Sequence, residues 1–523
     1  MAATQHVASI AMSNAAIDST STSLPKKKRG RRGGNTADIP KPRKTLLLDE
    51  LGDALVDQLY TSTTLDDRLD VSHLSVIDHL RHSRTSLTLS SGVSLRSGSS
   101  RTLTGVDSTP PTSLDDRVSP PVKPPPRHDE PLDADPHQAD VFSLGDFSTM
   151  TAIQSLTAQY GRVAHMGILD HSYRFFVNKA RSGALSFKIQ NRVAIVGGDP
   201  LCGPDIMADL LDEFTEYRRR RRWGIAFMGA SESFIRDVAQ PRGWATIRFG
   251  TERVLNPQTN DVLLERGGKR ITVQNRQLLH PQKGGITLGV YAPTVHGTDT
   301  RLQAELIAIY DAWRARRNDA AGPQAFITVY DPFALPALMT FVYSRDPAGR
   351  INGFAALRRL GGGGYHIDPC IAAPGGAKGI SDLLIVAAMA LLHRAGVSYL
   401  GFGFEPVHLL SSDDITGMSG PLPHITRDMY RHAFQCLPIS GKKAYHDKFR
   451  PDPPQDSGLY LVFPGGVPGP RHLFAMVHMA NISLRKVLWA DLRQWVSGRK
   501  RKSAAKSEPE TVDAKCAVDS VDR

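Results

Sequence analysis

Two stretches of the sequence show the same predicted order of elements, and this internal repeat constrains the fold more than any other feature. Residues 186–229 are predicted to form two strands, the loop GDPLCGP, an amphipathic helix and a further strand. Residues 351–403 are predicted to form a β-hairpin, the loop APGGAKG, an apolar helix and a final strand. Between them, residues 302–317 have the helical spacing of a connecting helix. The sequence therefore predicts an α/β protein with two similar domains side by side, at residues 141–320 and 321–468.

The N-terminal segment has a different composition, rich in Ser, Thr, Pro, Asp and Arg. Such a segment buries too little apolar surface to fold, so residues 1–140 are predicted to form a disordered arm. Its basic run PKKKRGRR, residues 25–32, is either a nuclear signal or a tether to RNA or anionic lipid, or else a solvated patch. One short helix is predicted at residues 44–59, where it would dock on a partner.

The C-terminal segment and the apolar runs bear on membrane contact. Residues 469–502 predict an amphipathic, tryptophan-bearing helix with a basic end, which would lie on a membrane or pack against the domain body. A disordered tail is predicted at residues 503–523. The longest apolar run, residues 383–392, has about half of the roughly 20 residues that a membrane span needs, and no secretory signal opens the chain. We therefore expect a cytoplasmic protein that associates peripherally with membranes.

The net charge and the cysteines limit the classes of partner and cofactor that the sequence predicts. The formal net charge of +12 favours a polyanionic partner, either a nucleic acid or an anionic membrane surface. The sequence has no CxxC pair and no histidine near a cysteine at metal-ligand spacing, so neither a zinc site nor a disulfide framework is predicted. The four cysteines are Cys202, Cys370, Cys436 and Cys516. A reducing compartment and no bound metal are expected.

The loop before the second apolar helix, residues 372–381, stands where a GNAT-type acyltransferase core binds the pyrophosphate of coenzyme A. It lacks the Gly-Lys-Ser/Thr ending of a P-loop. It also lacks the Arg/Gln-x-x-Gly-x-Gly/Ala pattern of acetyl-coenzyme A users, so no nucleotide cofactor is expected. The loop either binds another anion, with Gly379 and Ser381 as substrate contacts, or forms a tight helix start with Ser381 as N-cap.

Seven segments resemble, in order, landmarks of the phosphatidylglycerol lysyltransferase C-terminal family. They are GGDPLCGP (197–204), RGWATIRFGTERVL (242–255), GGKRITVQNRQLLHPQKGG (267–285), the helix containing Trp313, GISDLLIVAAM (379–389), LGFGFEP (400–406) and KAYHDKFRPD (443–452). The resemblance covers about residues 147–465. It implies two tandem GNAT-like acyltransferase domains, the second of them catalytic, that move an amino acid from an aminoacyl-tRNA onto a lipid hydroxyl.

The sequence departs from the bacterial members of this family in two ways. Where they read Asp-Leu-Met-Arg, this chain keeps Asp368 but has Ile371 in place of the arginine that is expected to face an anionic phospholipid. The membrane spans that precede the bacterial domain are replaced by the low-complexity arm. The first departure disfavours a phosphate-bearing acceptor, and the second resembles the fungal branch that acylates the 3β-hydroxyl of ergosterol. Because no aminoacyl-tRNA synthetase domain is present, the resemblance is to ergosteryl-glycine synthases, and glycine is the expected amino acid.

The resemblance implies a transesterification, in which the lipid hydroxyl attacks the aminoacyl ester and the 3′-terminal ribose of the tRNA leaves. The ester already stores the free energy, so the reaction needs no ATP, coenzyme A or metal ion. The expected partners are charged tRNA, with tRNA-Gly as the expected species, and a sterol or other lipid at a membrane surface. The protein must align both substrates, assist proton transfer and stabilise an oxyanion.

Four residues are candidates for the catalytic groups. Asp368 would hold the substrate ammonium group or accept the hydroxyl proton, or else would cap the N–H groups of its own loop. Glu405 follows a buried strand and would recognise the amino group. Lys448 would polarise the ester carbonyl or bind a tRNA phosphate, unless it is a simple surface charge. His446 has a near-neutral reference pKa and would act as a base, or else it is structural.

Further polar residues are candidates for substrate and RNA contacts. Asp382 and Tyr445 would bind the substrate, although Asp382 would also complement the dipole of its helix. The cations of the family landmarks and a five-arginine run at the end of a helix would contact the tRNA backbone, although cations at a helix C-terminus are also ordinary dipole complements. These tRNA candidates are Lys269, Arg270, Lys443, Arg450, Arg218, Arg219, Arg220, Arg221 and Arg222.

Three other functions remain open from the sequence. In the first, the donor is the same and the acceptor is phosphatidylglycerol rather than ergosterol. In the second, the chain is a non-catalytic GNAT-like pair that binds RNA or membranes through its basic patches. In the third, it is a coenzyme A-dependent acetyltransferase, a function that the loop at residues 372–381 does not favour.

Overall fold

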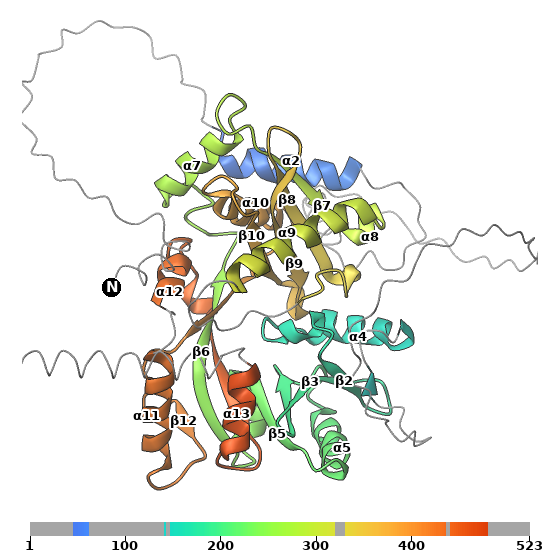
Figure 1. Cartoon of the computed structure of the whole chain (residues 1–523), viewed down its shortest axis with the longest axis vertical. Coiled ribbons are helices and arrows are strands. Elements are labelled where there is room, and N and C mark those ends of the chain that lie inside the picture. The colour runs from blue at the N-terminus through green and yellow to red at the C-terminus, as the bar shows by residue number, and fades with distance from the viewer. Residues whose placement is uncertain (1–44, 62–140, 143–146, 319–329, 436–439, 480–523) are drawn as a thin grey trace, which may run out of the picture.

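The computed structural model describes residues 45–61, 141–142, 147–318, 330–435 and 440–479. In these residues, 13 strands form one sheet, and helices pack on its faces (Figure 1). The predicted domain boundary at residues 320 and 321 lies outside the described residues. The basic run, the C-terminal tail, most of the N-terminal arm and residues 480–502 of the predicted C-terminal helix also lie outside them.

The first half of the described chain has the order of elements that the sequence predicts. Its strands and helix are β2 (Arg174–Val177), β3 (Ala184–Gln190), β4 (Val193–Gly197), α5 (Met207–Arg220) and β5 (Gly224–Ser231). They follow β1 (Val141–Phe142), α4 (Phe147–Tyr160) and η2 (His165–Leu169). β4 pairs with β5 in parallel, and all of its residues are buried, as is typical of a strand covered on both faces.

The second half repeats this order. Its elements are β8 (Met339–Arg345), β9 (Ile351–Arg359), β10 (Tyr365–Ala372), α10 (Ile380–Arg394) and β11 (Leu400–Pro406). Between the halves lie α7 (Lys269–Leu279), β7 (Thr287–Tyr291), α8 (Pro293–His296) and α9 (Thr300–Asn318), the last being the predicted connecting helix. The predicted α/β fold with two GNAT-like units is therefore confirmed.

The two halves exchange strands at the centre of the sheet. β6 (Ala245–Leu255) belongs to the first half, yet it pairs with β11 of the second half. β13 (Ser457–Phe463) comes from the end of the second half and lies between β5 and β6. The strand order is β1-β2-β3-β4-β5-β13-β6-β11-β10-β9-β8-β7. Each half therefore completes the sheet of the other.

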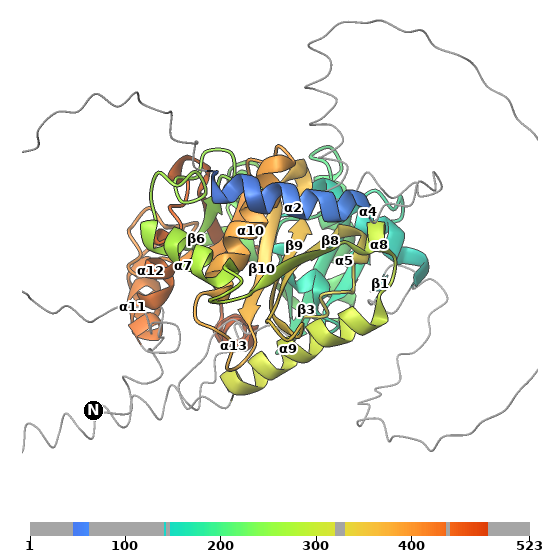
Figure 2. The same cartoon turned by 90° about the horizontal axis from the view of Figure 1, so that it is seen from above.

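Helices cover the second half on both faces of its strands. α10 packs on one face together with α2 (Leu47–Thr61), and α9 packs on the other face (Figure 2). Residues 383–392 of α10 are all buried, because the sheet lies on one side of this helix and α2 on the other. The longest apolar run of the sequence, residues 383–392, thus forms the centre of the apolar core of the second half.

The predicted helix near residues 44–59 is present as α2 and packs against its own chain. Its apolar side contacts α10, and Arg394 of α10 pairs with Asp49 and Asp53, each at 2.9 Å. The side chain of Gln58 also bonds to the edge strand β7, accepting from Val290 N and donating to Leu288 O. The apolar side of this helix is therefore covered by the chain itself and not left for a partner.

The remaining elements surround the exchanged strands. They are α6 (Glu232–Phe234), the π-helical turn η3 (Ile235–Ala239), η4 (Pro336–Leu338), η5 (Gly361–Gly363), β12 (Ile415–Thr416), α11 (Leu422–Gln435), α12 (Ser440–Asp447), η6 (Pro453–Gln455) and α13 (Pro470–Met479). α13 is the described part of the predicted C-terminal helix, and it buries Ala475 and Met476 in an apolar cluster with β4 and β5. Among the described residues, no helix is long and apolar enough to cross a bilayer.

Candidate functional site

The parallel strands β10 and β11 separate soon after they begin. They pair only at Tyr365 with Leu400 and at His366 with Gly401. Beyond these pairs, β11 continues along β6 while β10 continues along β9. Polar groups at the carboxyl ends of such diverging strands are well placed to contact a ligand. Asp368 follows the last paired residue of β10 by two positions, so it lies where the strands separate.

The structure corrects the expected surroundings of Asp368. The sequence predicts that the strand ends at this residue, but β10 continues to Ala372. The chain bulges between Ile367 and Cys370, where the Asp368–Pro369 peptide bond is cis, and pairing with β9 then resumes. A bulge places an extra residue in one strand without ending the ladder, which explains why a Pro inside the segment does not end the strand.

The start of α10 also differs from the prediction. The N-cap is Gly379, with φ of 96°, and not Ser381. Glycine adopts this left-handed conformation at little cost, whereas serine does not. Ser381 lies in the first turn instead, and its carbonyl accepts a hydrogen bond from Cys370 Sγ at 3.5 Å. Gln274 of α7 donates to the carbonyl of Lys378, which fixes the loop against α7.

Two of the predicted residues form an ion pair that joins α10 to the end of α12. Lys448 Nζ lies 2.5 Å from Asp382 Oδ2 and 2.6 Å from Oδ1. Asp382 is buried, and about a third of the Lys448 side chain is exposed. The ammonium also lies 5.2 Å from the ring centres of Tyr445 and Phe449. Asp382 therefore holds a cation in place, beyond any effect on the helix dipole.

Tyr445 and His446 are packed inside the protein next to this pair. Both rings lie against Phe402 of β11, with centres 5.8 Å and 5.0 Å away. His446 is only 2% exposed. Burial raises the pKa of Tyr445 well above its usual 10, and the nearby Cys370 and Asp382 act in the same direction. Tyr445 thus stays a neutral hydroxyl, and the base role of His446 stays a prediction.

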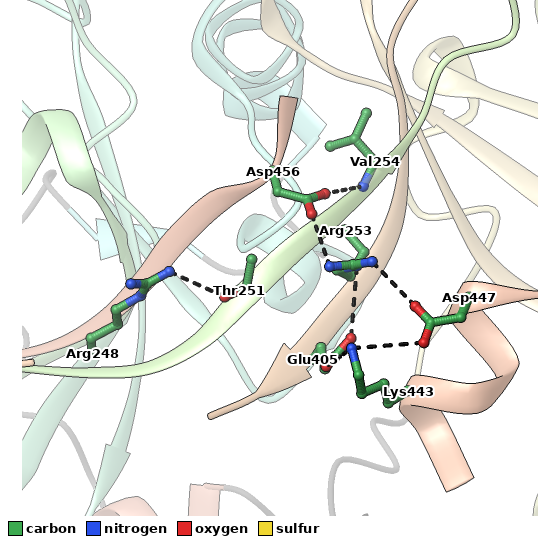
Figure 3. Close-up of polar contacts among 8 residues, drawn as sticks. All are labelled: Arg248, Thr251, Arg253, Val254, Glu405, Lys443, Asp447 and Asp456. Atoms are coloured by element: carbon green, nitrogen blue, oxygen red, sulfur yellow. Dashed lines mark hydrogen bonds and ion pairs between the residues drawn. The ribbon is translucent and has the colours of Figure 1, made fainter. Parts of the chain in front are cut away.

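Glu405 belongs to a network of charges around Arg253, at the crossing of β6, β11 and α12 (Figure 3). Arg253 lies 3.7 Å from Glu405, 3.4 Å from Asp447 and 2.9 Å from Asp456. Lys443 lies 3.3 Å from Glu405 and 3.7 Å from Asp447. Both the predicted amine ligand Glu405 and the predicted RNA contact Lys443 are therefore engaged with groups of the chain.

Asp368 acts electrostatically on the face of the sheet that α9 covers. Burial raises the pKa of Tyr310 to about 12, and the charge of Asp368 contributes to this increase. Burial lowers the pKa of Arg317, and Asp368 opposes that change. The Asp382–Lys448 pair lies on the other face, with α10 and α12. Burial raises the pKa of Cys370, and the charges of Asp382 and Asp368 act in the same direction, so both carboxylates lie near the strand separation.

Two buried charges on the α9 face were not predicted from the sequence. Arg358 of β9 and Glu252 of β6 are each 1% exposed. Burial lowers the pKa of Arg358 to about 10, while Tyr330, Asp368 and Glu252 oppose this decrease. The available signal was a charged residue inside each apolar strand, in FAALRR and in GTERVL, since a buried charge commonly marks a functional site.

The predicted tRNA contacts lie in two separate regions. Lys269 and Arg270 are exposed at the start of α7, where they line an open hollow of about 450 Å³ together with Val273 and Gln274. Arg450 is exposed just after α12. The five-arginine run ends α5 at the far end of the sheet, away from α7 and α12 in both views (Figures 1 and 2).

Part of the arginine run is engaged in local contacts. Arg221 lies 3.9 Å from the ring centre of Tyr217, and Arg218 donates to the carbonyl of Trp223. Arg220 pairs with Glu216 at 2.5 Å. These contacts are typical of the end of a surface helix. Among the described residues, no cluster of three or more His, Cys, Asp or Glu residues could hold a metal ion.

The fold and the diverging strands define a mixed α/β protein of the tandem GNAT-like class. Residues 154–462 match the profile of the family described as phosphatidylglycerol lysyltransferase, C-terminal, which covers more than half of the chain. The chain belongs to this family, whose members are aminoacyl-tRNA-dependent lipid acyltransferases.

The individual relatives have low sequence identity to this chain. The lysylphosphatidylglycerol biosynthesis bifunctional protein LysX of Rhodococcus jostii is 21% identical over 281 residues, which are 53% of this chain and 24% of LysX. The MprF-like domain protein Rv1619 of Mycobacterium tuberculosis is 24% identical over 233 residues, 43% of this chain and 46% of the relative. The structure of L-PGS from Bacillus licheniformis is 18% identical, with a TM-score of 0.49, over 66% of this chain and 98% of that one. The chain thus spans less than half the length of LysX and of Rv1619.

Proposed function

We propose that this protein is a transferase that moves an amino acid, glycine, from aminoacyl-tRNA onto the 3β-hydroxyl of ergosterol. The observation that carries the proposal is the family match over residues 154–462, which includes both halves of the sheet and the site where β10 and β11 separate. The sterol acceptor and glycine rest on the resemblance to the freestanding fungal branch.

The proposed reaction exchanges one ester for another. The sterol oxygen forms a bond to the carbonyl carbon of the aminoacyl group, and the bond from that carbon to the ribose oxygen breaks. The proton of the sterol hydroxyl is transferred to the departing ribose oxygen. Asp368, where the strands separate, is the proposed carrier of this proton, an effect worth about 10²–10⁴ in rate.

Lys448 is the proposed group that stabilises the negative charge on the carbonyl oxygen. Asp382 holds its ammonium at 2.5 Å, and the neighbouring aromatic rings restrict its motion. A preorganised cation at this position stabilises a developing oxyanion by a few kcal/mol. In this account Asp382 is a positioning residue, because it acts through Lys448.

The apolar surroundings of Ile371 support an uncharged acceptor. Ile371 is 4% exposed and packs in a cluster with Phe341 and Phe354. A phospholipid headgroup needs a cation at hydrogen-bond distance, and an arginine at this position would have to be buried in that cluster. Phosphatidylglycerol is the second candidate acceptor, because the family and LysX are named for it.

In this proposal the tRNA binds to the basic surface of the protein, and the lipid acceptor is taken from a membrane. The net charge of +12 suits tRNA and anionic membranes. Exposed apolar side chains on α11 and α13, among them Ile425, Leu473 and Phe474, suit shallow contact with a bilayer. We therefore place the protein in the cytoplasm, peripherally bound to a membrane.

Lipid extracts from cells with and without the gene test the proposal. We expect a glycylated sterol that is present only with the gene and that is lost on mild alkaline hydrolysis. A glycylated phosphatidylglycerol would support the second candidate instead. Identical extracts under conditions where the protein is made would support a non-catalytic binding module.

A further inference from the structure

A small cavity lies beside the paired ends of β10 and β11, apart from the Asp382–Lys448 pair. Its volume is about 240 Å³. Glu252 of β6 and Tyr399 form part of its wall, together with Arg162 and the backbone of the glycine-rich turn at residues 361–364. The cavity therefore combines a carboxylate, a hydroxyl and a cation in a small space.

Glu252, which lines this cavity, has one carboxylate oxygen without a hydrogen-bond partner among the described residues. The hydroxyl of Tyr399 donates to Glu252 Oε1. The second oxygen, Oε2, is buried and has no hydrogen-bond partner among the described residues. Leaving a buried carboxylate oxygen without a donor costs free energy, which a ligand with N–H groups would recover.

The neighbouring arginines favour the ionised form of the Glu252 carboxylate, but they do not pair with its free oxygen. The charges of Arg162 and Arg358 oppose the effect of burial, which raises the pKa of Glu252. Arg358 instead donates through Nη2 to the carbonyls of Arg162 and Val163, at 3.1 Å and 3.4 Å. In the described part of the chain, neither arginine makes an ion pair with Glu252, so its Oε2 remains available.

The other acidic candidates are already occupied. Asp382 is paired with Lys448, and Glu405 is paired with Arg253 and Lys443. Among these three acidic residues, Glu252 is therefore the one whose carboxylate has an oxygen, Oε2, that neither accepts a hydrogen bond nor forms an ion pair within the described chain.

The glycines of the turn keep the cavity small. A Cβ at Gly361 would lie 2.4 Å from the carbonyl oxygen of Gln159, and a Cβ at Gly364 would lie 2.8 Å from the ring of Tyr399. Glycine at these positions lets the turn approach α4 and Tyr399 closely. The small volume of about 240 Å³ suits a small aminoacyl group.

We propose that this cavity binds the primary ammonium group of the amino acid on the donor tRNA, with Glu252 Oε2 as its acceptor. This assignment rests on the proposed function. Arg358 connects the cavity to the site of strand separation. It pairs with His366 in the β9–β10 ladder, two positions before Asp368, and its side chain reaches the carbonyls of Arg162 and Val163, two residues that line the cavity.

Glu252→Gln in the full chain tests the assignment, because it keeps the shape and removes the charge. We expect KM for glycyl-tRNA to rise roughly 10- to 100-fold, the effect of losing a charged hydrogen bond, with kcat within a few-fold of wild type. Glu305→Gln on the exposed side of α9 is the matched control and should leave KM unchanged. An unchanged KM in folded Glu252→Gln would overturn the proposal.

Binding of glycinamide, measured by calorimetry, separates this proposal from the proposed function. Glycinamide carries the ammonium group, whereas N-acetylglycinamide does not, so only the first should bind, and Glu252→Gln should abolish its binding. Such binding without any lipid product would keep the amine site and refute the transferase. If Glu252→Gln does not fold, Tyr399→Phe replaces it and should weaken glycinamide binding several-fold; unchanged binding in that variant would overturn the amine site.

Discussion

Lys448 and Asp382 are 66 positions apart in the sequence, yet they form an ion pair of 2.5 Å beside the site where β10 and β11 separate. The pair joins α10, the buried helix of the second half, to the end of α12. A lysine held in this way has little freedom to move away from the site. The geometry thus turns two separately predicted residues into one functional unit.

Asp382→Asn should lower kcat about 10- to 100-fold with little change in KM, because the ammonium of Lys448 would no longer be held in place. The free energy of unfolding should fall by about 1–3 kcal/mol, less than for a fully buried pair because Lys448 is partly exposed. Steady-state kinetics and urea denaturation measure the two effects. Asp428→Asn, which breaks the exposed pair with Arg431, is the control. A normal kcat in Asp382→Asn would remove Lys448 from the mechanism.

Charge reversal of Lys269 and Arg270 should weaken tRNA binding, because both cations are exposed around the hollow at α7. The slope of log affinity against log salt should become shallower by about 1–2 if both contact phosphates. Filter binding at several salt concentrations measures the slope. Lys179→Glu, at an exposed position of the first half, is the control. Affinity that falls only in variants of the run at residues 218–222 would move the RNA surface to α5.

Leu59→Ala should destabilise the protein by about 2–4 kcal/mol, because this side chain of α2 is fully buried in the apolar cluster around α10. Urea denaturation of the full chain measures the loss. Asp57→Ala, on the exposed side of the same helix, should change stability by less than about 0.5 kcal/mol. Equal stabilities of the two variants would mean that α2 does not pack on α10.

The stability of the protein should depend on pH through Glu252. Burial raises the pKa of this residue above its usual 4.5, so the folded protein holds the proton more tightly than the unfolded chain. This contribution is complete below pH 4.5 and is lost as the pH rises through the folded-state pKa. As the pH rises from roughly 4 to 7, the unfolding free energy of the wild type should therefore fall relative to that of Glu252→Gln. A constant difference would mean that burial does not perturb Glu252.

The order of elements within each half could be predicted because it is local. Apolar periodicity and the two Gly/Pro loops specify strands, helix and strand in both copies. The exchange of β6 and β13 could not be predicted, because strand partners distant in sequence leave no local signal. The N-cap was misplaced for a related reason: Ser381 has a typical capping side chain, but the backbone geometry at Gly379 decides the start of the helix.

The candidate site was predicted in part. Family landmarks identify Asp368, Asp382 and Lys448, but not the pairing of the last two. Glu252 and Arg358 were missed because their burial follows from tertiary packing, which the pattern of a single strand does not encode. Roles for all of these residues stay predictions.

Purified protein incubated with radiolabelled glycyl-tRNA and ergosterol gives the most direct measurement of the central claim. We expect a labelled sterol ester that forms without ATP and that does not form when the tRNA is first digested with RNase. The Asp368→Asn and Lys448→Met variants should form this ester at least about 10-fold more slowly. Absence of any labelled sterol, with label appearing instead in phosphatidylglycerol or in no lipid at all, would contradict the account.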